Sequence, residues 1–267
     1  MSEPSSIDQL FERTRAENRA ALVGYLPAGF PDLKASIAAI EAMVDGGVDL
    51  VEVGLPYSDP VMDGPVIQAA ADRALSGGTR TSDVIDVVRA SADTGAPTVV
   101  MTYWNPVERY GVDRFAADLA DAGGAGLITP DLTPDEAGEW IDASGAHGLD
   151  RIFLVAPSST DERLAMTAEA SSGFVYATSI MGVTGQREQT SSLAPTLVER
   201  LRKVTDKPVG VGLGVSNRAQ AQEVAAFSDA VIVGSALVRC LLDTESGSTG
   251  VDAVRELSRE LREGMAR

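Results

Sequence analysis

Short apolar runs alternate with amphipathic segments along almost the whole chain. The apolar runs are rich in aliphatic and β-branched residues, which predicts strands. These strands lie at 21–26, 50–53, 97–103, 126–129, 152–156, 174–178, 209–213 and 230–233. Between them the apolar residues recur at helical spacing, which predicts helices at about 33–45, 66–76, 82–94, 115–121, 161–170 and 193–204.

Further helices are predicted at the two ends of the chain and after three of the strands. Residues 6–18 have an amphipathic pattern, and this helix is expected to plug the bottom of the fold. The run Thr133-Pro-Asp-Glu136 has the composition of a helix start, with threonine as the cap and glutamate reaching back. Ser216 is expected to cap another helix, a short apolar segment at 236 begins one more, and a charged helix from about 251 closes the chain.

Eight strands that alternate with helices indicate a parallel sheet that is buried on both faces, because each strand is a nearly continuous apolar run. A length of 267 residues allows two small domains or one large one. No stretch resembles a linker, so the pattern predicts a single (β/α)8 TIM barrel over residues 1–267 with an extra N-terminal helix. In such barrels the reactive groups lie at the carboxyl ends of the strands.

Charge and cysteine content limit the possible partners and compartment. A net charge of -17 disfavours nucleic acid and anionic membranes, so any phosphate must be held by local groups. The single cysteine, Cys240, excludes an internal disulfide, fits a reducing compartment and is expected in the core. The start is not signal-like and no apolar run is long enough to span a bilayer, so we expect a cytoplasmic protein.

Two acidic residues stand out in the segment 49–65. Glu52 lies inside an apolar strand, where a carboxylate is costly unless it is paired or used. Asp63 lies on the loop after this strand, which proline and glycine residues stiffen. The two carboxylates could therefore face one pocket. The alternative is a buried acid held by backbone amides and a loop acid that caps a helix.

Elimination of other reactive groups leaves acid–base chemistry. The only histidine, His147, is expected in a surface turn at the wrong end of the barrel, which removes a histidine-ligated metal and a Ser-His-Asp triad. None of the three lysines is placed to form a Schiff base. The polar residues that remain at strand ends are Glu52, Asp63, Tyr103, Asn105, Asp131 and Tyr176. Taken alone, Tyr103 and Tyr176 are each better explained as barrel lining with the hydroxyl satisfied by a neighbour.

Two glycine turns near the C-terminus predict a phosphate site. Gly212-Leu-Gly214 ends the seventh predicted strand, and Gly234-Ser235 ends the eighth just before a short apolar segment. Loops after these two strands, with the helix N-terminus that follows, form the usual phosphate cradle of such barrels. Backbone amides would there replace basic side chains.

Residues 51–65 closely resemble the signature of the second strand in the tryptophan synthase alpha subunit family. The segments 181–185, 212–214 and 233–235 resemble further family motifs in matching order, and the resemblance spans nearly the whole chain. It implies cleavage of indole-3-glycerol phosphate to indole and glyceraldehyde 3-phosphate, a retro-aldol reaction in tryptophan biosynthesis. Glu52 would be the general acid/base, and Asp63 would hold the indole N–H and stabilise the positive charge that develops on the ring.

The resemblance also implies a substrate-binding set. Its members are Tyr25, Tyr103, Tyr176, Thr184, Gly185, Gly212, Gly214, Gly234 and Ser235. The tyrosines would line the indole pocket, Thr184 would approach Asp63 on a mobile loop, and the glycines from Gly185 onward with Ser235 would hold phosphate. Tyr25 stands where a phenylalanine is often found, and the segment 178–182 lacks a basic residue that other members often carry.

Partners follow from the same resemblance. It implies no cofactor in this chain, and a pyridoxal-phosphate beta subunit that forms an α2β2 heterotetramer and receives indole through a tunnel. The proline-braced loop 57–60 is expected to take part in that contact. Two other hypotheses remain: another phosphate-binding TIM-barrel lyase or isomerase, which should not release indole, and a non-catalytic regulatory subunit, against which the retention of both acids speaks.

Overall fold

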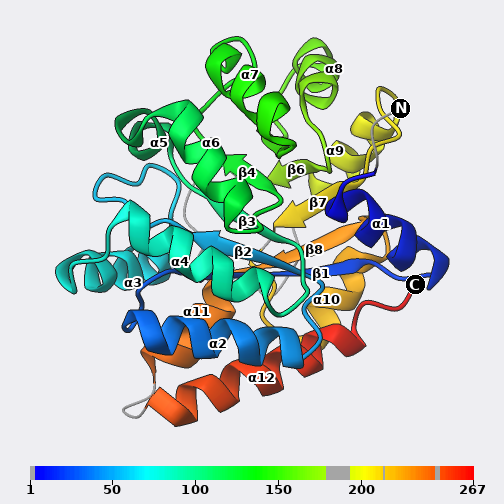
Figure 1. Ribbon diagram of the computed structural model, residues 1–267. Coiled ribbons are helices and arrows are strands. Elements are labelled where there is room, and N and C mark those ends of the chain that lie inside the picture. Colours follow the sequence, from blue (N-terminus) through cyan, green and yellow to red (C-terminus); the bar gives the residue numbers. More distant parts are fainter. Residues whose placement is uncertain (1–3, 179–192, 213, 244–246) are drawn as a thin grey trace.

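A closed barrel of eight parallel strands forms the centre of the structure, which is a computed structural model (Figure 1). The structure describes residues 4–178, 193–212, 214–243 and 247–267. The strands follow one another around the barrel in chain order: β1 (Ala21–Pro27), β2 (Leu50–Gly54), β3 (Thr98–Met101), β4 (Gly126–Thr129), β5 (Asp150–Val155), β6 (Val175–Thr178), β7 (Val209–Gly212) and β8 (Ala230–Val233). The predicted TIM-barrel fold is confirmed.

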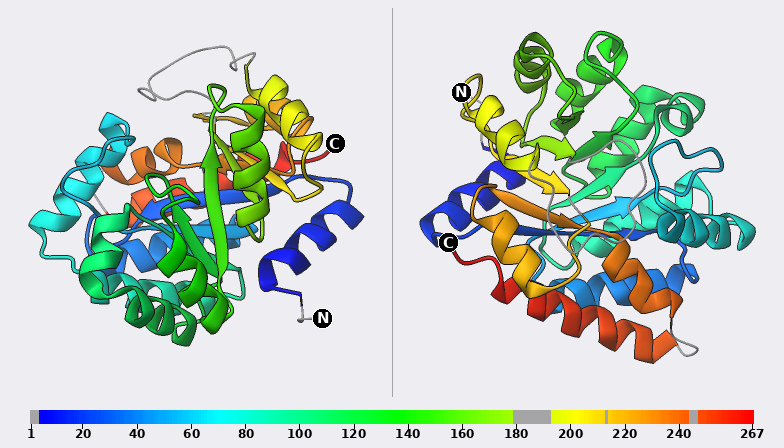
Figure 2. Two further views of the ribbon diagram at one scale, coloured as in Figure 1. Left: turned by 90° about the horizontal axis from the view of Figure 1, so that it is seen from above. Right: turned by 180° about the vertical axis from the view of Figure 1, so that it is seen from behind.

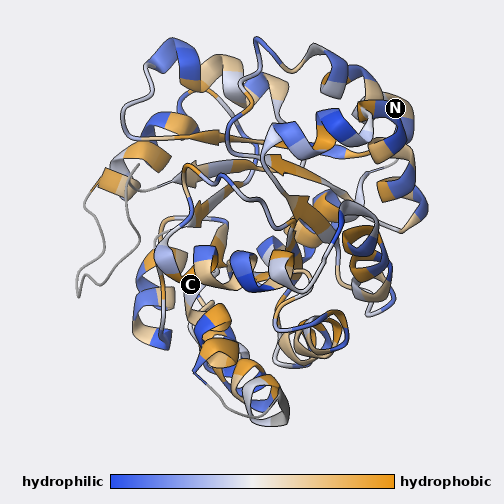
Figure 3. Ribbon diagram, turned by 90° about the vertical axis from the view of Figure 1, so that its left-hand side faces the viewer, coloured by the Kyte–Doolittle hydropathy of each residue, from blue (hydrophilic) through white to orange (hydrophobic). Residues whose placement is uncertain are grey.

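Helices surround the barrel. They are α1 (Ser6–Ala16), α2 (Leu33–Asp45), α3 (Pro65–Ser76), α4 (Thr81–Ala92), α5 (Trp104–Tyr110), α6 (Val112–Asp121), α7 (Gly138–His147), α8 (Asp161–Ala170), α9 (Leu193–Arg202), α10 (Arg218–Ala225), α11 (Ser235–Leu242) and α12 (Gly247–Glu263). Hydrophobic residues gather on the strands and on the helix faces turned toward them, while the outer helix faces are mainly hydrophilic (Figure 3). In the described part of the chain, no helix is long and apolar enough to cross a membrane.

Alternation along the strands divides the core into an outer and an inner part. Residues such as Leu22 pack outward under the helices, whereas Val23 and Leu50 point into the barrel. Helix α1 lies across the amino-terminal end of the strands (Figure 2). Its Phe11 ring lies 5.8 Å from the ring of Phe174, and both are buried. The prediction that this helix closes the bottom of the barrel is therefore confirmed.

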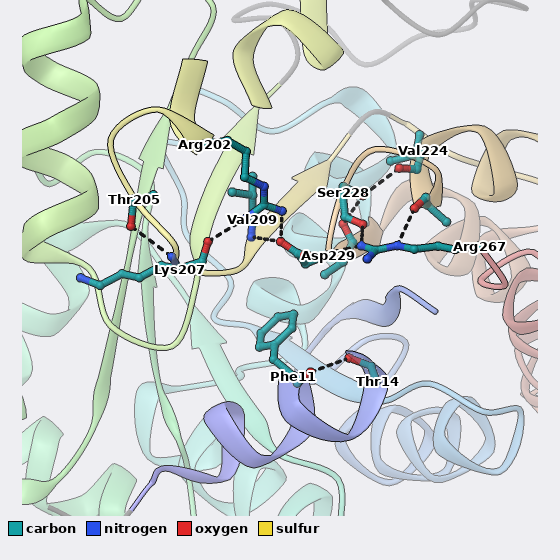
Figure 4. A network of polar contacts seen from close by, with 12 residues as sticks. Phe11, Thr14, Arg202, Thr205, Lys207, Val209, Val224, Ser228, Asp229 and Arg267 are labelled. Atoms are coloured by element: carbon teal, nitrogen blue, oxygen red, sulfur yellow. Dashed lines mark hydrogen bonds and ion pairs between the residues drawn. The ribbon is translucent and has the colours of Figure 1, made fainter. Parts of the chain in front are cut away.

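Charged residues at the same end tie the last strands to the C-terminus (Figure 4). The carboxylate of Asp229 accepts hydrogen bonds from Arg202, from Arg267 at 3.2 Å and from the Val209 N–H at 2.9 Å. Burial raises the pKa of Asp229, but these partners hold it below its ordinary value. Lys207 donates to three main-chain carbonyls at the carboxyl end of α8, those of Ala168, Glu169 and Ser171. Lys207 is thus engaged at the amino-terminal end of the barrel, which agrees with the prediction that it is not placed to form a Schiff base in the pocket.

Three local predictions are wrong. The third strand ends at Met101, and the residues after Thr102 begin α5, which the sequence analysis missed. Residues 133–136 form a turn in which the N–H of Glu136 donates to the carbonyl of Thr133, so α7 begins only at Gly138. The cap of α10 is Asn217 rather than Ser216. His147, which was predicted in a surface turn, is instead the last residue of α7, and its ring contacts Asp113 at 3.2 Å. It precedes β5 and so lies at the end of the barrel away from the expected chemistry, as predicted.

Candidate active site

Glu52 lies inside the barrel, one layer above the apolar interior. It follows Leu50 by two positions on β2, so its side chain also points into the barrel, one layer nearer the carboxyl end of the strands. Only 1% of Glu52 is exposed, and within the described residues its buried Oε2 has no hydrogen-bond partner. Burial, followed by the nearby charge of Asp63, raises the pKa of Glu52 to about 8. The alternative of a carboxylate held by backbone amides is therefore not observed.

Asp63 lies on the loop between β2 and α3. The hydroxyl of Tyr103 donates to its Oδ1 at 3.0 Å. Burial raises the pKa of Asp63, and the hydrogen bond from Tyr103 opposes that rise. Asp63 does not cap α3 with its side chain, because the N-cap residue is Gly64 and no side chain caps that helix. The second part of the alternative is thus also not observed.

Two further tyrosines share the barrel interior with the acids. Tyr25 is the register partner of Glu52 on the neighbouring strand, and its hydroxyl occupies the space that a Cβ at Gly54 would need. Tyr176 lies in the same way against Gly212, where a Cβ would come within 2.6 Å of the hydroxyl oxygen. Burial raises the pKa of both tyrosines well above the ordinary value, and the Glu52 charge adds to this rise. The glycines thus make room for the two hydroxyls beside the acids.

The predicted phosphate residues lie at the same end of the barrel. Gly234 is the N-cap residue of α11 and Ser235 is its first residue, so the amino end of this helix faces the carboxyl end of β8. Gly214 has φ +70°, a left-handed conformation that favours glycine. Gly212 ends β7, where its lack of a side chain is also required by Tyr176. Thr184 and Gly185 lie outside the described residues.

Other polar residues at strand ends are structural. The Asp131 carboxylate accepts the N–H of Trp104 at 3.0 and 3.1 Å and so caps α5. Asn105 accepts from Arg109 at 3.2 Å along the same helix. Met101 and Leu154, which were not among the predicted site residues, are partly buried and pack on the inner core. The alternation of side chains along β3 and β5 could have identified them, because it places them on the inner face of the barrel together with Val99 and Ile152.

The fold and the carboxylate pair define a class of protein, a TIM-barrel enzyme with acid–base groups at the carboxyl end of its strands. A family model described as tryptophan synthase alpha chain matches residues 11–266. The chain therefore belongs to the tryptophan synthase alpha chain family. It is a carbon–carbon lyase that acts on indole-3-glycerol phosphate, with a beta chain as its partner. In this family pyridoxal phosphate is held by the beta chain and not by the alpha chain.

Individual tryptophan synthase alpha chains match this chain over nearly its whole length. The chain is 64% identical to the tryptophan synthase alpha chain of Salinispora arenicola over 261 residues, which cover 98% of each. It is 61% identical to that of Nocardia farcinica over 265 residues, 99% of this chain and 97% of the relative. A structure of Mycobacterium tuberculosis tryptophan synthase has 58% identity and a TM-score of 0.93, covering 99% of this chain and 100% of that chain. The alpha subunit of Legionella pneumophila has 32% identity and a TM-score of 0.86, with 97% and 98% covered.

Phosphate affinity should depend on Gly234. A Cβ at this position would lie 3.3 Å from the Tyr25 ring, so the branched side chain of Gly234→Val would crowd both this ring and the amino end of α11. We expect a loss of roughly tenfold or more in affinity for glycerol 3-phosphate, the effect of one lost charge-assisted hydrogen bond. Isothermal titration measures this loss. Gly145→Val is the control, because nothing lies within 4 Å of a Cβ there; equal affinities of the two folded variants would contradict the cradle.

Proposed function

We propose that Glu52 and Asp63 carry out the retro-aldol cleavage of indole-3-glycerol phosphate. The observation that carries this assignment is the Glu52 carboxyl itself. It is buried, its Oε2 lacks a hydrogen-bond partner within the described residues, and its pKa is about 8. A carboxyl group with such a pKa holds its proton near neutral pH and can transfer it.

The proton movements balance without another reagent. Glu52 donates its proton to the indole carbon that bears the side chain, which leaves a positively charged ring. The carbon–carbon bond then breaks, its electron pair returns to the ring, and the adjacent side-chain hydroxyl becomes the aldehyde. The Glu52 carboxylate accepts the proton that this hydroxyl loses, so the acid is restored. Indole and glyceraldehyde 3-phosphate are the products.

Asp63 supplies the opposite charge. An ionised carboxylate at the indole N–H stabilises the positive ring, and a preorganised charge acts strongly in a partly buried site. The Tyr103 hydrogen bond favours this ionised form, because it opposes the effect of burial on the Asp63 pKa. The proposed reaction uses the two acids in different protonation states, a neutral donor at Glu52 and an anion at Asp63.

The remaining site residues are assigned around this pair. Tyr25, Tyr103 and Tyr176 would surround the indole and glycerol parts of the substrate. Gly212, Gly214, Gly234 and Ser235, with Thr184 and Gly185 from the segment that the structure does not describe, would bind phosphate and close over it. We also propose that the chain is one domain, which the single closed barrel supports, and that it acts in the cytoplasm, as is typical of this biosynthetic family.

An indole-release assay tests these roles. Asp63→Asn should lower kcat by roughly 10²–10³-fold, because the amide can still accept the indole N–H but cannot neutralise the ring charge. Indole is measured from indole-3-glycerol phosphate with the alpha chain alone and with saturating beta chain. Asp206→Asn, which changes an exposed aspartate before β7, is the matched control. Wild-type activity in Asp63→Asn would remove Asp63 from the mechanism.

A further inference from the structure

One side chain holds both ends of the loop that carries Asp63. The hydroxyl of Tyr103 accepts the N–H of Met62 at 2.9 Å and donates to the Asp63 carboxylate at 3.0 Å. The ring of Tyr57, at the other end of the loop, lies against the Tyr103 ring with centroids 5.3 Å apart. We call these four residues, Tyr57, Met62, Asp63 and Tyr103, the clasp. Between its ends the loop extends outward, and Val61 is 78% exposed.

The anchor of the clasp is rigid. Tyr103 is 5% exposed and follows β3 by two residues, where it is the N-cap residue of α5. The next N–H, that of Trp104, is bound by both carboxylate oxygens of Asp131. A strand end, a helix start and this cap therefore fix the backbone of Tyr103 on both sides. The loop that carries Asp63 is thus attached through Tyr103 to the end of β3 and the start of α5.

The clasp leaves Asp63 only partly satisfied. Its Oδ1 is bound by Tyr103, and no hydrogen bond to its Oδ2 occurs within the described residues. The second oxygen remains available to a donor in the site. The titratable groups that face Asp63 are Tyr103 on its own side, Glu52 on β2 and Tyr25 on β1. Of these, Tyr103 is the one that donates a hydrogen bond to the carboxylate.

We propose that Tyr103 is a positioning residue for the lyase reaction, which aims the Asp63 carboxylate by clasping its loop before substrate binds. This role rests on the proposed function of Asp63. It differs from the predicted role of Tyr103 as pocket lining, because the hydroxyl is engaged on both sides by the loop. Preorganisation of this kind contributes to the transition state more than to substrate binding. Loss of the hydroxyl therefore lowers kcat and has little effect on KM.

The test is Tyr103→Phe, which keeps the ring and its contact with Tyr57. Assayed in complex with the beta chain, kcat should fall about tenfold to a hundredfold, the effect of one hydrogen bond to a charged group. KM should stay within about threefold, because the phosphate cradle is untouched. The acidic limb of the kcat–pH profile should move to higher pH, since the hydrogen bond that opposes the rise of the Asp63 pKa is gone.

Tyr110→Phe is the matched control. It removes another tyrosine–carboxylate hydrogen bond, from Tyr110 to Asp118 at 2.6 Å, on helices outside the barrel. Its kcat and its acidic limb should equal those of the wild type. A Tyr103→Phe variant with wild-type kcat and an unmoved acidic limb would overturn the clasp.

A second variant covers a failure of Tyr103→Phe to fold. Tyr57→Leu keeps the hydroxyl of Tyr103 and removes the ring contact, so kcat should fall by a smaller factor of about two to ten. If only this variant folds and its kcat is unchanged, the clasp is likewise overturned.

The clasp and the proposed function of Asp63 can fail separately. If Asp63→Asn releases indole more slowly than the wild type but Tyr103→Phe does not, the proposed function stands and only the clasp fails. If Asp63→Asn releases indole as fast as the wild type, the proposed function itself fails.

Discussion

Glu52→Gln should lower kcat for indole release by about 10²–10⁴-fold, the usual contribution of a general acid–base group. Glutamine has nearly the same shape as glutamate but transfers no proton. Glu52 is buried, and so are the other residues of β2. Because glutamine fills nearly the same space, the substitution should leave the packing around this position unchanged. The variant should therefore still bind its substrate, and it should do so without consuming it.

Binding and chemistry are separated by two measurements on this variant. Titration with indole-3-glycerol phosphate itself gives the dissociation constant, which should lie within about threefold of the KM of the wild type when chemistry is slow. Glu223→Gln provides the matched control, since it makes the same replacement at an exposed glutamate of α10. Its activity should be that of the wild type. A Glu52→Gln enzyme that releases indole at the rate of the parent would exclude Glu52 as the proton donor.

The strands were the most predictable part of the fold. The predicted bounds of β4, α8 and β8 agree with the structure at both ends. Each of these strands is an apolar run that is buried on both faces, so local composition and tertiary environment require the same residues. Helix α8 carries its cap, Thr160, in the adjacent sequence, and the side chain accepts from the N–H of Arg163.

Helix α5 could not be predicted in the same way. Its N-terminus is capped by Asp131, which lies 27 positions away in the sequence. Its first residues include aromatic side chains that favour strands, and Pro106 reads as a helix breaker although a first turn tolerates it. The wrong helix start at 133–136 has a related cause. The Thr133 hydroxyl donates to Glu136 at 3.4 Å within a turn, so the expected cap contact is not made.

In the candidate site, too, local sequence predicted some features, whereas others depend on contacts between residues far apart in the sequence. That Glu52 and Asp63 lie at the same end of the barrel followed from the strand and its loop alone. The link from Asp63 to Tyr103 spans 40 positions and depends on where two loops meet, which no local pattern records. The reason for glycine at position 54 was equally hidden, because it is set by the Tyr25 hydroxyl on the neighbouring strand.

Glu52→Gln should also change how stability depends on pH. An unfolded chain ionises Glu52 near its ordinary pKa of 4.5, whereas the folded chain keeps the proton until about pH 8. Between these values the folded state binds a proton that the unfolded state has lost, so the free energy of unfolding falls as pH rises. Above about pH 8 both states are ionised and the loss is complete. A shift of this size corresponds to as much as about 5 kcal/mol.

The variant lacks this titration, so its stability relative to the wild type should rise steadily from about pH 5 to pH 8 and then level off. The change with pH isolates the carboxyl group, because any constant difference between a buried amide and a buried acid is the same throughout. Denaturant unfolding of both proteins at a series of pH values measures the difference. Glu223→Gln should give a curve parallel to that of the wild type. Parallel curves for Glu52→Gln would mean that Glu52 ionises in the folded protein as it does in the unfolded chain, and the proton that the mechanism requires would not be held at neutral pH.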